Sequence, residues 1–319
     1  MHSDMGELVD GVWKTGWYDP DARGAFQRPP TKFRGRIGSS GTELRPEPGR
    51  YHLYVSYACP WAHRTLLTRA LRGLEDAISV TVVDPKMGDS GWAFSAEEPD
   101  PILGATLLQE IYLRADKKYS GRVTVPVLWD KRTATIVNNE SREVMRMLDT
   151  ELEGCAQNHT SLAPPELRDR VDQVLDAIYA PVNNGVYRAG FATTQQAYEE
   201  ACHEVFAALD HWEEVLGKQR YLCGAVLTEA DLAMFTTLLR FDVVYYAHFK
   251  CNVRRVQDYP NLWGYLRDIY QMPDVKKTCR LDQIKVHYYF SQTTVNPHRI
   301  VPLGPTIDLE GKHDRGRFG

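Results

Sequence analysis

The fold of the first part of this chain is decided by the stretch Tyr54-Val55-Ser56-Tyr57-Ala58-Cys59-Pro60-Trp61-Ala62-His63-Arg64. Before it, a run of strand-forming residues begins at Tyr51, and after Pro60 the apolar residues recur at helical spacing. The pattern predicts a strand, a short turn and a helix, with Cys59 at or just before the first helical turn. Pro60 suits that turn, because its missing N–H would have no partner there in any case.

Cys59 is the first candidate for chemistry. The free N–H groups and the positive end of a helix favour an anion, so we expect the pKa of this thiol to lie below that of a solvated cysteine. His63 and Arg64 can add positive charge one turn further on. Ala62 stands where a second cysteine would complete a Cys-x-x-Cys pair, so the thiol needs an external resolving thiol. The simpler alternative is a structural cysteine that only fills a core.

Length and composition bound the class of protein. The chain has 319 residues, enough for two domains with sizeable cores. A formal net charge of -4 gives no electrostatic reason to bind nucleic acid, and no run of about 18 apolar residues predicts a membrane span. The six cysteines are scattered, and the N-terminus lacks a hydrophobic signal segment. We therefore expect a soluble cytoplasmic protein without a disulfide framework.

Residues 50–150 are predicted to form a thioredoxin-like α/β domain. The expected elements are a strand at 51–57, a helix at 60–74, strands at 79–83, 127–129 and 135–137, and a helix at 141–148. Strand–helix–strand followed by a hairpin and a helix is the order of the thioredoxin fold. The range 84–121 is an unusually long insertion, and its aromatic residues Trp92 and Phe94 favour a function over disorder.

The remaining chain is predicted to form three parts. Residues 1–49 are rich in glycine, proline and arginine, but their aromatic residues indicate an arm packed on the body of the protein. Residues 164–296 are expected to form an all-helical domain, and residues 297–319 a tail that either wraps over a surface or is disordered. The expected helices are 167–179, 195–216, 229–246, 259–270 and 281–290. Thr228 and Asp231 form a variant of the capping box, a structural motif without a catalytic role.

Two further motifs of the first domain suit a peptide-like ligand. Val125-Pro126 lies just before a predicted strand, where thioredoxin-like domains place a cis-proline beside the active cysteine. Most X-Pro bonds are trans, so the prediction of a cis bond depends on this context. Ser141 at a helix start can hold a carboxylate, and Glu140 can accept from an ammonium group, which suits an α-amino acid head group. Alone, Glu140 and Ser141 would be an ordinary helix cap, but together with Cys59 and Val125-Pro126 they follow the order and spacing of a glutathione site.

Together with the expected helical second domain, these motifs resemble the glutathione transferase superfamily. Within it, the segment from Tyr57 to Arg64 resembles the signature of the Xi class, the glutathionyl-hydroquinone reductases. Further matching motifs are Gly91-Trp92-Ala93-Phe94, Val125-Pro126-Val127-Leu128-Trp129-Asp130, Asn138-Asn139-Glu140-Ser141, the run from Tyr179 to Ala192, Arg240-Phe241-Asp242 and His287-Tyr288-Tyr289. Each motif alone is a weak signal, but the set covers the chain from Trp13 to Pro297 and its order is specific.

The resemblance implies a reaction. The thiolate of Cys59 attacks the glutathione sulfur of a glutathionyl-hydroquinone and releases the hydroquinone, and a second glutathione resolves the mixed disulfide to give oxidised glutathione. The implied site residues are Cys59, Tyr179 and Tyr288 as catalytic groups, Trp92, Arg122, Val125, Pro126, Glu140 and Ser141 for glutathione, and Tyr187, His287 and Tyr289 for the hydroquinone. For each tyrosine, the alternative is an amphipathic aromatic in a helical core.

Glutathione, as a cosubstrate, is the only cofactor that the resemblance implies, and the family expectation is a homodimer. Cys59 and His63 are four residues apart, but no second Cys/His pair completes a zinc site, and no glycine-rich loop predicts a nucleotide. Two alternatives stay open: an Omega-like thioltransferase or dehydroascorbate reductase that uses the same cysteine, and a non-catalytic module with the same fold. The long insertion and the tyrosine-rich second domain argue against the first, and an intact Cys59 with a complete pocket argues against the second.

Overall fold

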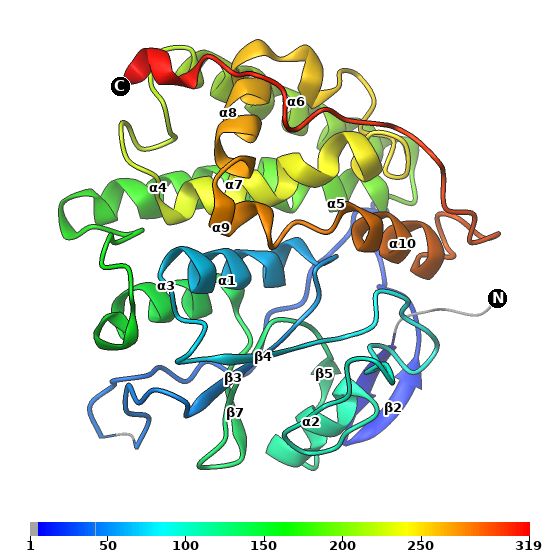
Figure 1. Ribbon diagram of the computed structural model, residues 1–319. Helices are drawn as coiled ribbons and strands as arrows, with labels where there is room; N and C mark the ends of the chain where they lie inside the picture. The colour runs from blue at the N-terminus through cyan, green and yellow to red at the C-terminus, as the bar shows by residue number, and fades with distance from the viewer. Residues whose placement is uncertain (1–5, 42) are drawn as a thin grey trace. The chain divides into compact units, whose positions relative to one another are not determined.

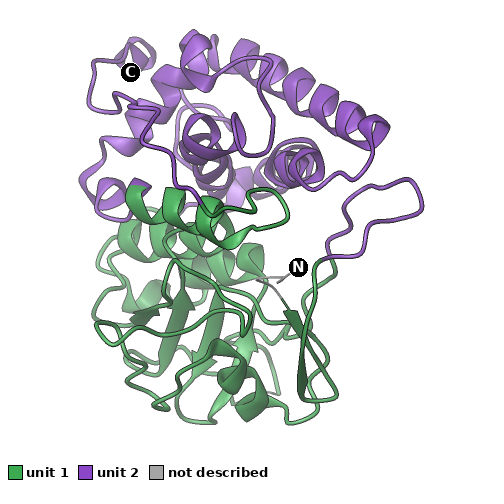
Figure 2. Ribbon diagram, turned by 90° about the vertical axis from the view of Figure 1, so that its right-hand side faces the viewer, with its two compact units in different colours: residues 1–17, 29–161, 282–299 green, residues 18–28, 162–281, 300–319 purple. Residues whose placement is uncertain are grey.

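The computed structural model describes residues 6–41 and 43–319, and the chain divides into two compact units (Figure 2). The first unit holds the described residues up to Trp17 and those of Pro29–Ser161 and Asp282–Arg299, and the second holds Tyr18–Arg28, Leu162–Leu281 and Ile300–Gly319. This division differs from the expected ranges, because residues 29–49 and 282–299 pack in the first unit and residues 18–28 in the second. The expected domain ranges stay predictions.

A four-stranded sheet forms the centre of the first unit. Its strands are β3 (Tyr51–Val55), β4 (Ser79–Val82), β6 (Val127–Asp130) and β7 (Thr135–Asn138), in the order β4–β3–β6–β7. β3 pairs parallel to β4 and antiparallel to β6, and every residue of β3 and β6 is buried, as in strands covered on both faces. Two helices, α1 (Pro60–Leu71) and α3 (Ser141–Thr150), pack against each other (Figure 1). This order of elements confirms the predicted thioredoxin-like fold.

The N-terminal arm contributes strands that the sequence analysis did not predict. β1 (Gly6–Val9) and β2 (Val12–Thr15) form an antiparallel hairpin, and β1 also pairs with β5 (Gly121–Arg122) at the end of the insertion. Asp10 and Gly11 at the hairpin turn both have positive φ angles, 49° and 79°. Positive φ at both central residues is the requirement of a type I′ turn, whose twist matches that of a hairpin.

The insertion is fixed to the central sheet by a buried carboxylate. It contains one helix, α2 (Leu108–Ala115). Asp100 accepts a hydrogen bond from the Tyr54 hydroxyl of β3 at 3.0 Å and from the N–H groups of Ile102 and Leu103 at 3.0 Å. A buried acceptor with several donors holds its loop firmly, because leaving any of these groups unpaired would cost free energy.

Helices form the second unit. They are α4 (Arg168–Ile178), α5 (Gly185–Gly190), α6 (Gln195–Leu216), α7 (Glu229–Arg240), α8 (Pro260–Tyr270) and the short α9 (Pro273–Lys276). The expected helix 229–246 is α-helical only to Arg240 and continues as a π-helical segment, Phe241–Tyr245; a second such segment, Tyr179–Asn183, follows α4. The last predicted helix is α10 (Leu281–Ser291), nearly all of which belongs to the first unit. Among the described residues, none of the helices combines the length and the apolarity that a bilayer span needs.

The predicted capping box at the start of α7 is present. The carboxylate of Asp231 accepts from the N–H and the hydroxyl of Thr228, both at 2.8 Å, and from the N–H of Leu222 at 2.8 Å. The side chain is fully buried, and burial raises the pKa of Asp231 to about 6. This arrangement gives Asp231 the structural role that the sequence indicated.

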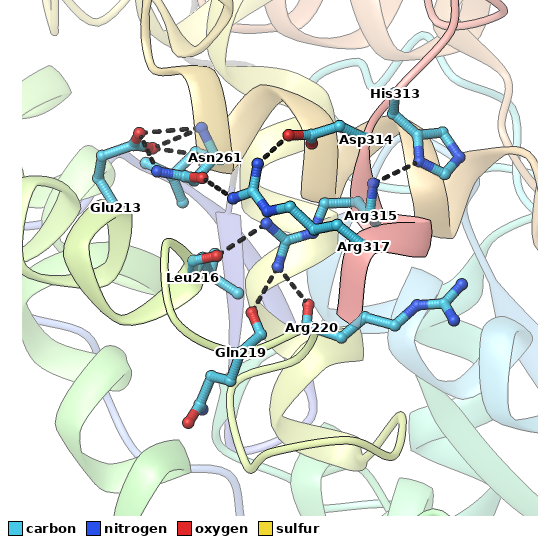
Figure 3. A network of polar contacts seen from close by, with 10 residues as sticks. Glu213, Leu216, Gln219, Arg220, Asn261, His313, Asp314, Arg315 and Arg317 are labelled. Atoms are coloured by element: carbon cyan, nitrogen blue, oxygen red, sulfur yellow. Dashed lines mark hydrogen bonds and ion pairs between the residues drawn. The ribbon is translucent and has the colours of Figure 1, made fainter. Parts of the chain in front are cut away.

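The C-terminal segment packs on the second unit through a buried arginine (Figure 3). The guanidinium of Arg315 donates to the carbonyls of Leu216, Gln219 and Arg220 at 2.8, 2.6 and 2.7 Å. These carbonyls lie at and just beyond the end of α6, where helix carbonyls have no intrahelical donor. The tail therefore wraps over a surface, which is the first of the two expected alternatives.

Candidate functional site

Cys59 is the N-cap residue of α1, and Pro60 is the first residue of the helix, as predicted. The side chain is partly exposed, and its Sγ lies 3.6 Å from the carbonyl oxygen of Val125. The Val125–Pro126 peptide bond is cis, which confirms the prediction made from its context. The structure thus brings together two motifs of the predicted glutathione site that are far apart in the sequence.

Burial governs the reactivity of the other five cysteines. Burial raises the pKa of each of these thiols, to about 12 for Cys279, so the thiolate is disfavoured at Cys155, Cys202, Cys223, Cys251 and Cys279. Because the thiolate is the reactive form of cysteine, chemistry at neutral pH is not expected at these five positions. This leaves Cys59 as the candidate nucleophile.

The N-terminus of α3 carries the predicted pair Glu140 and Ser141. Glu140 is the N-cap residue and accepts from the N–H of Arg142 at 3.3 Å and from the hydroxyl of Thr31 at 3.3 Å. Ser141 Oγ is buried, and none of the described residues offers it a hydrogen-bond partner. A buried hydroxyl without a partner is costly unless a ligand or a water molecule satisfies it. The free N–H groups of a helix start favour an anionic group at the same place.

Trp92 of the insertion and His287 of α10 lie against each other. Their rings stack with centroids 4.6 Å apart and planes at 18°. His287 Nδ1 is 2.9 Å from the carbonyl oxygen of Pro85, and since a carbonyl only accepts, Nδ1 carries the proton. Tyr288 packs edge-on against His287 at 5.3 Å, and both Tyr288 and Tyr289 are buried. The first unit therefore contains the three α10 residues that the resemblance implied.

Arg122 is engaged by the N-terminal arm. Its guanidinium donates to the carbonyls of Gly16 and Trp17 at 2.9 and 2.7 Å and lies 3.9 Å from the carboxylate of Glu7. These contacts give Arg122 a role in holding the arm, which the sequence analysis did not foresee. The contact of Arg122 with a ligand carboxylate remains a prediction.

The two remaining candidates, Tyr179 and Tyr187, lie in the second unit and have different surroundings. Tyr179 opens the π-helical segment after α4 and is 44% exposed. Helical segments of this kind often occur at functional sites. Tyr187 is buried, and the guanidinium of Arg28 lies 4.8 Å from its ring centroid while Arg28 Nε donates to the side-chain oxygen of Asn184 at 2.8 Å. A role for either tyrosine toward a hydroquinone stays a prediction.

Several contacts of the site were not predicted. Thr31 of the arm reaches Glu140, and the carbonyl of Pro85 orients His287. Neither Thr31 nor Pro85 belongs to a recognisable sequence motif. Threonine hydroxyls and backbone carbonyls are common, so only the tertiary fold determines which of them contacts Glu140 or His287. Within the described ranges, no group of three or more His, Cys, Asp or Glu side chains is arranged to hold a metal ion.

Comparison with known proteins gives matches over the whole chain. Models of the glutathione S-transferase N-terminal and C-terminal domains match residues 58–151 and 195–268. The chain is 50% identical over 328 residues to the glutathionyl-hydroquinone reductase YqjG of Escherichia coli (strain K12), covering 99% of this chain and 100% of that protein. Among solved structures, the Xi class glutathione transferase of Natrialba magadii superposes with a TM-score of 0.93 and 52% identity over 99% of both chains. The glutathione-bound structure of YqjG superposes with a TM-score of 0.89 and 47% identity, covering 98% of this chain and 99% of that one.

Proposed function

Because this chain belongs to the Xi class of the glutathione transferase family, we propose that it catalyses the glutathione-dependent reduction of glutathionyl-hydroquinones to hydroquinones. The observation that carries the proposal is the position of Cys59, which is the N-cap residue of α1 and whose Sγ lies 3.6 Å from the Val125 carbonyl oxygen that precedes the cis-proline. A single thiol at this place suits a reaction in which the protein forms a mixed disulfide with glutathione and does not resolve it alone.

The reaction proceeds in two steps with Cys59 as the nucleophile. In the first, the Cys59 thiolate attacks the sulfur of the glutathionyl group, a sulfur–sulfur bond forms and the bond from sulfur to the aryl carbon breaks. The aryl carbon takes the electron pair and gains a proton, which releases the hydroquinone. In the second, the thiolate of another glutathione attacks the mixed disulfide, so that oxidised glutathione leaves and the Cys59 thiol is restored. Two glutathione sulfurs are oxidised and one aryl carbon is reduced.

Glutathione is held by the first unit in this proposal. Glu140 and Ser141 receive the γ-glutamyl head group, with the orphaned Ser141 hydroxyl as the group that the ligand satisfies. Val125 offers its backbone to the cysteinyl part beside Cys59, with Pro126 fixing that turn. The indole of Trp92 packs along the peptide. Arg122 binds a glutathione carboxylate in this proposal, and the bonds that its guanidinium makes to the arm carbonyls of Gly16 and Trp17 would orient it for that contact.

Tyrosines bind the hydroquinone in this proposal. Tyr179 and Tyr288 donate hydrogen bonds to the ring oxygens or supply the proton, since a phenol can act as donor and as general acid. Tyr187, His287 and Tyr289 complete the hydroquinone site. We further propose that the protein acts as a cytoplasmic homodimer and uses no metal and no nucleotide.

Turnover of a glutathionyl-hydroquinone with excess glutathione tests the proposal. Wild type should release the free hydroquinone together with oxidised glutathione, and the Cys59→Ser variant should release neither. Intact-mass analysis of wild type with substrate and no further glutathione should detect one glutathione adduct on Cys59. Activity on mixed disulfides or dehydroascorbate without hydroquinone release would assign the protein to the thioltransferase alternative instead. Absence of activity and adduct would favour a non-catalytic module.

A further inference from the structure

A single hydroxyl of the insertion joins the two backbone segments that flank the glutathione residues. The Tyr112 hydroxyl, in α2, donates to the carbonyl of Thr124 at 2.7 Å and accepts from the Thr124 N–H at 3.2 Å. It also accepts from the side-chain amide of Asn139 at 3.0 Å. Thr124 directly precedes Val125, and Asn139 directly precedes Glu140. The hydroxyl therefore bridges the cis-proline turn and the start of α3.

This bridge uses the full hydrogen-bonding capacity of the phenol. A tyrosine hydroxyl has one proton to donate and two lone pairs to accept with, and all three are used here. Tyr112 is fully buried, and burial raises its pKa, so the proton needed for the Thr124 carbonyl is retained. Such a network in a dry interior is stiff, because the loss of any member leaves buried groups unpaired.

The far side of Asn139 is fixed as well. The side-chain oxygen of Asn139 accepts a hydrogen bond from the backbone N–H of Phe33 at 3.2 Å. The backbone N–H of Asn139 donates to the Phe33 carbonyl at 3.1 Å. The Phe33 ring packs edge-on against Tyr112 at 5.8 Å and stacks on Tyr119 at 5.4 Å. The arm, the insertion and the start of α3 are thus joined at one buried point of the first unit.

We propose that Tyr112 is a positioning residue for glutathione: its hydroxyl sets the spacing between the Val125 backbone and the Glu140–Ser141 pair. The inference rests on the proposed function, since it assumes that these two segments hold the two ends of one γ-glutamyl-cysteinyl ligand. It gives the long insertion a function beyond carrying Trp92. Tyr112 acts through Thr124 and Asn139 and is not itself a ligand contact.

The test compares Tyr112→Phe with Tyr54→Phe. Both variants remove only a hydroxyl from a fully buried tyrosine of the first unit, but the Tyr54 hydroxyl binds Asp100 of the insertion loop. For Tyr112→Phe we expect the KM for the glutathionyl-hydroquinone, whose glutathionyl part occupies this site, to rise about tenfold, the size expected from one lost hydrogen bond, with kcat at saturating substrates within about twofold of wild type. For Tyr54→Phe we expect a lower melting temperature with an unchanged KM.

Calorimetric titration with glutathione, carried out on the Cys59→Ser background, separates this inference from the proposed function. A tenfold weaker Kd for Tyr112→Phe supports the positioning role even if no hydroquinone is turned over. An unchanged Kd and KM, with only a lower melting temperature, would reduce Tyr112 to a structural residue and overturn the inference. If Tyr112→Phe does not fold, Asn139→Ala removes the other end of the bridge and should weaken glutathione binding by a similar factor. Binding as tight as that of the parent in Asn139→Ala would also overturn the inference.

Discussion

The indole of Trp92 stacks face to face on the imidazole of His287, with ring centroids 4.6 Å apart, although one residue comes from the insertion and the other from α10, about 195 residues further along the chain. The imidazole is itself held by a hydrogen bond from Nδ1 to the Pro85 carbonyl. Ser291, one turn further along α10, accepts from the N–H of Met87 at 2.9 Å. The segment around Trp92 is therefore supported by α10 at two successive turns.

From this stack we predict that His287 acts on glutathione through Trp92. His287→Ala removes both the stacking ring and the bond to Pro85, so the Kd for glutathione should rise roughly five- to tenfold, in line with the loss of an aromatic pair. His287→Phe keeps a ring and should have a smaller effect. Calorimetric titration with glutathione on the Cys59→Ser background gives this Kd, and initial rates give the KM for the glutathionyl-hydroquinone. A raised KM with an unchanged Kd for glutathione would contradict the prediction and leave His287 with its proposed contact to the hydroquinone alone.

The cysteines should differ sharply in their reaction with iodoacetamide. A raised pKa lowers the thiolate fraction at pH 7, so Cys155, Cys202, Cys223, Cys251 and Cys279 should react slowly in the folded protein. Cys59 at its helix start should be alkylated first, and prior incubation with glutathionyl-hydroquinone should protect it. Peptide mass spectra at short times give the order of modification. Early alkylation of Cys279, whose pKa is raised to about 12, would contradict the prediction.

Local signals in the sequence were sufficient to predict much of the fold and the backbone geometry at two places of the candidate site. Cys59 and Pro60 lie at the predicted helix start, and Val125–Pro126 is cis as expected. Such features depend on a few neighbouring residues, so a sequence pattern can identify them. The hairpin of the arm had one local signal, the Asp10-Gly11 pair, but its strands of four residues are too short to show a clear alternation.

Contacts between distant segments could not be predicted in this way. The bond between the Tyr112 hydroxyl and Asn139 depends on where α2 packs, and nothing in either residue's neighbours specifies the other. The same holds for Arg122, whose sequence position indicated a ligand contact while the fold brings the carbonyls of Gly16 and Trp17 to its guanidinium. Candidate site residues that belong to local motifs could thus be proposed from the sequence, whereas their contacts with distant segments required the tertiary structure.

His52 should make the protein less stable in mild acid. Its ring nitrogens lie 2.7 Å from the Ser79 hydroxyl and 2.9 Å from the Thr81 hydroxyl, and burial lowers the pKa of His52 from 6.5 to about 4. The unfolded chain binds a proton near pH 6.5 and the folded protein does not, so stability is lost as the pH falls from about 6.5 to about 4. The loss corresponds to at most about 3 kcal/mol. Urea unfolding at pH 7 and pH 4.5 should show that the free energy of unfolding falls less in His52→Gln than in wild type. An equal fall in both proteins would mean that His52 is not the source of the acid sensitivity.

Arg315 should contribute far more to stability than its neighbour Arg317. Arg315→Ala removes the donor that serves three carbonyls around the end of α6, and we expect a loss of about 3 kcal/mol in the free energy of unfolding. Arg317→Ala is the matched control: its side chain is 42% exposed and pairs with Asp314, so the loss should be below about 1 kcal/mol. Urea denaturation of both variants measures the difference. Similar losses would mean that the tail is not anchored by Arg315.

Ser141 should affect ligand binding and stability in opposite directions. Its hydroxyl is buried without a partner among the described residues, and the N-cap role at α3 belongs to Glu140, so Ser141→Ala removes an unpaired polar group from the ligand-free protein. The free energy of unfolding should stay unchanged or rise by up to about 1 kcal/mol. Glutathione binding should weaken about tenfold, because the ligand loses the hydrogen bond that the orphaned hydroxyl offers.

Thr31→Val is the matched control, since it removes the hydroxyl that already serves Glu140 and should lower stability instead. Calorimetric titration with glutathione and urea unfolding together decide the matter: a less stable Ser141→Ala protein with unchanged affinity would mean that this hydroxyl serves the fold and not the ligand.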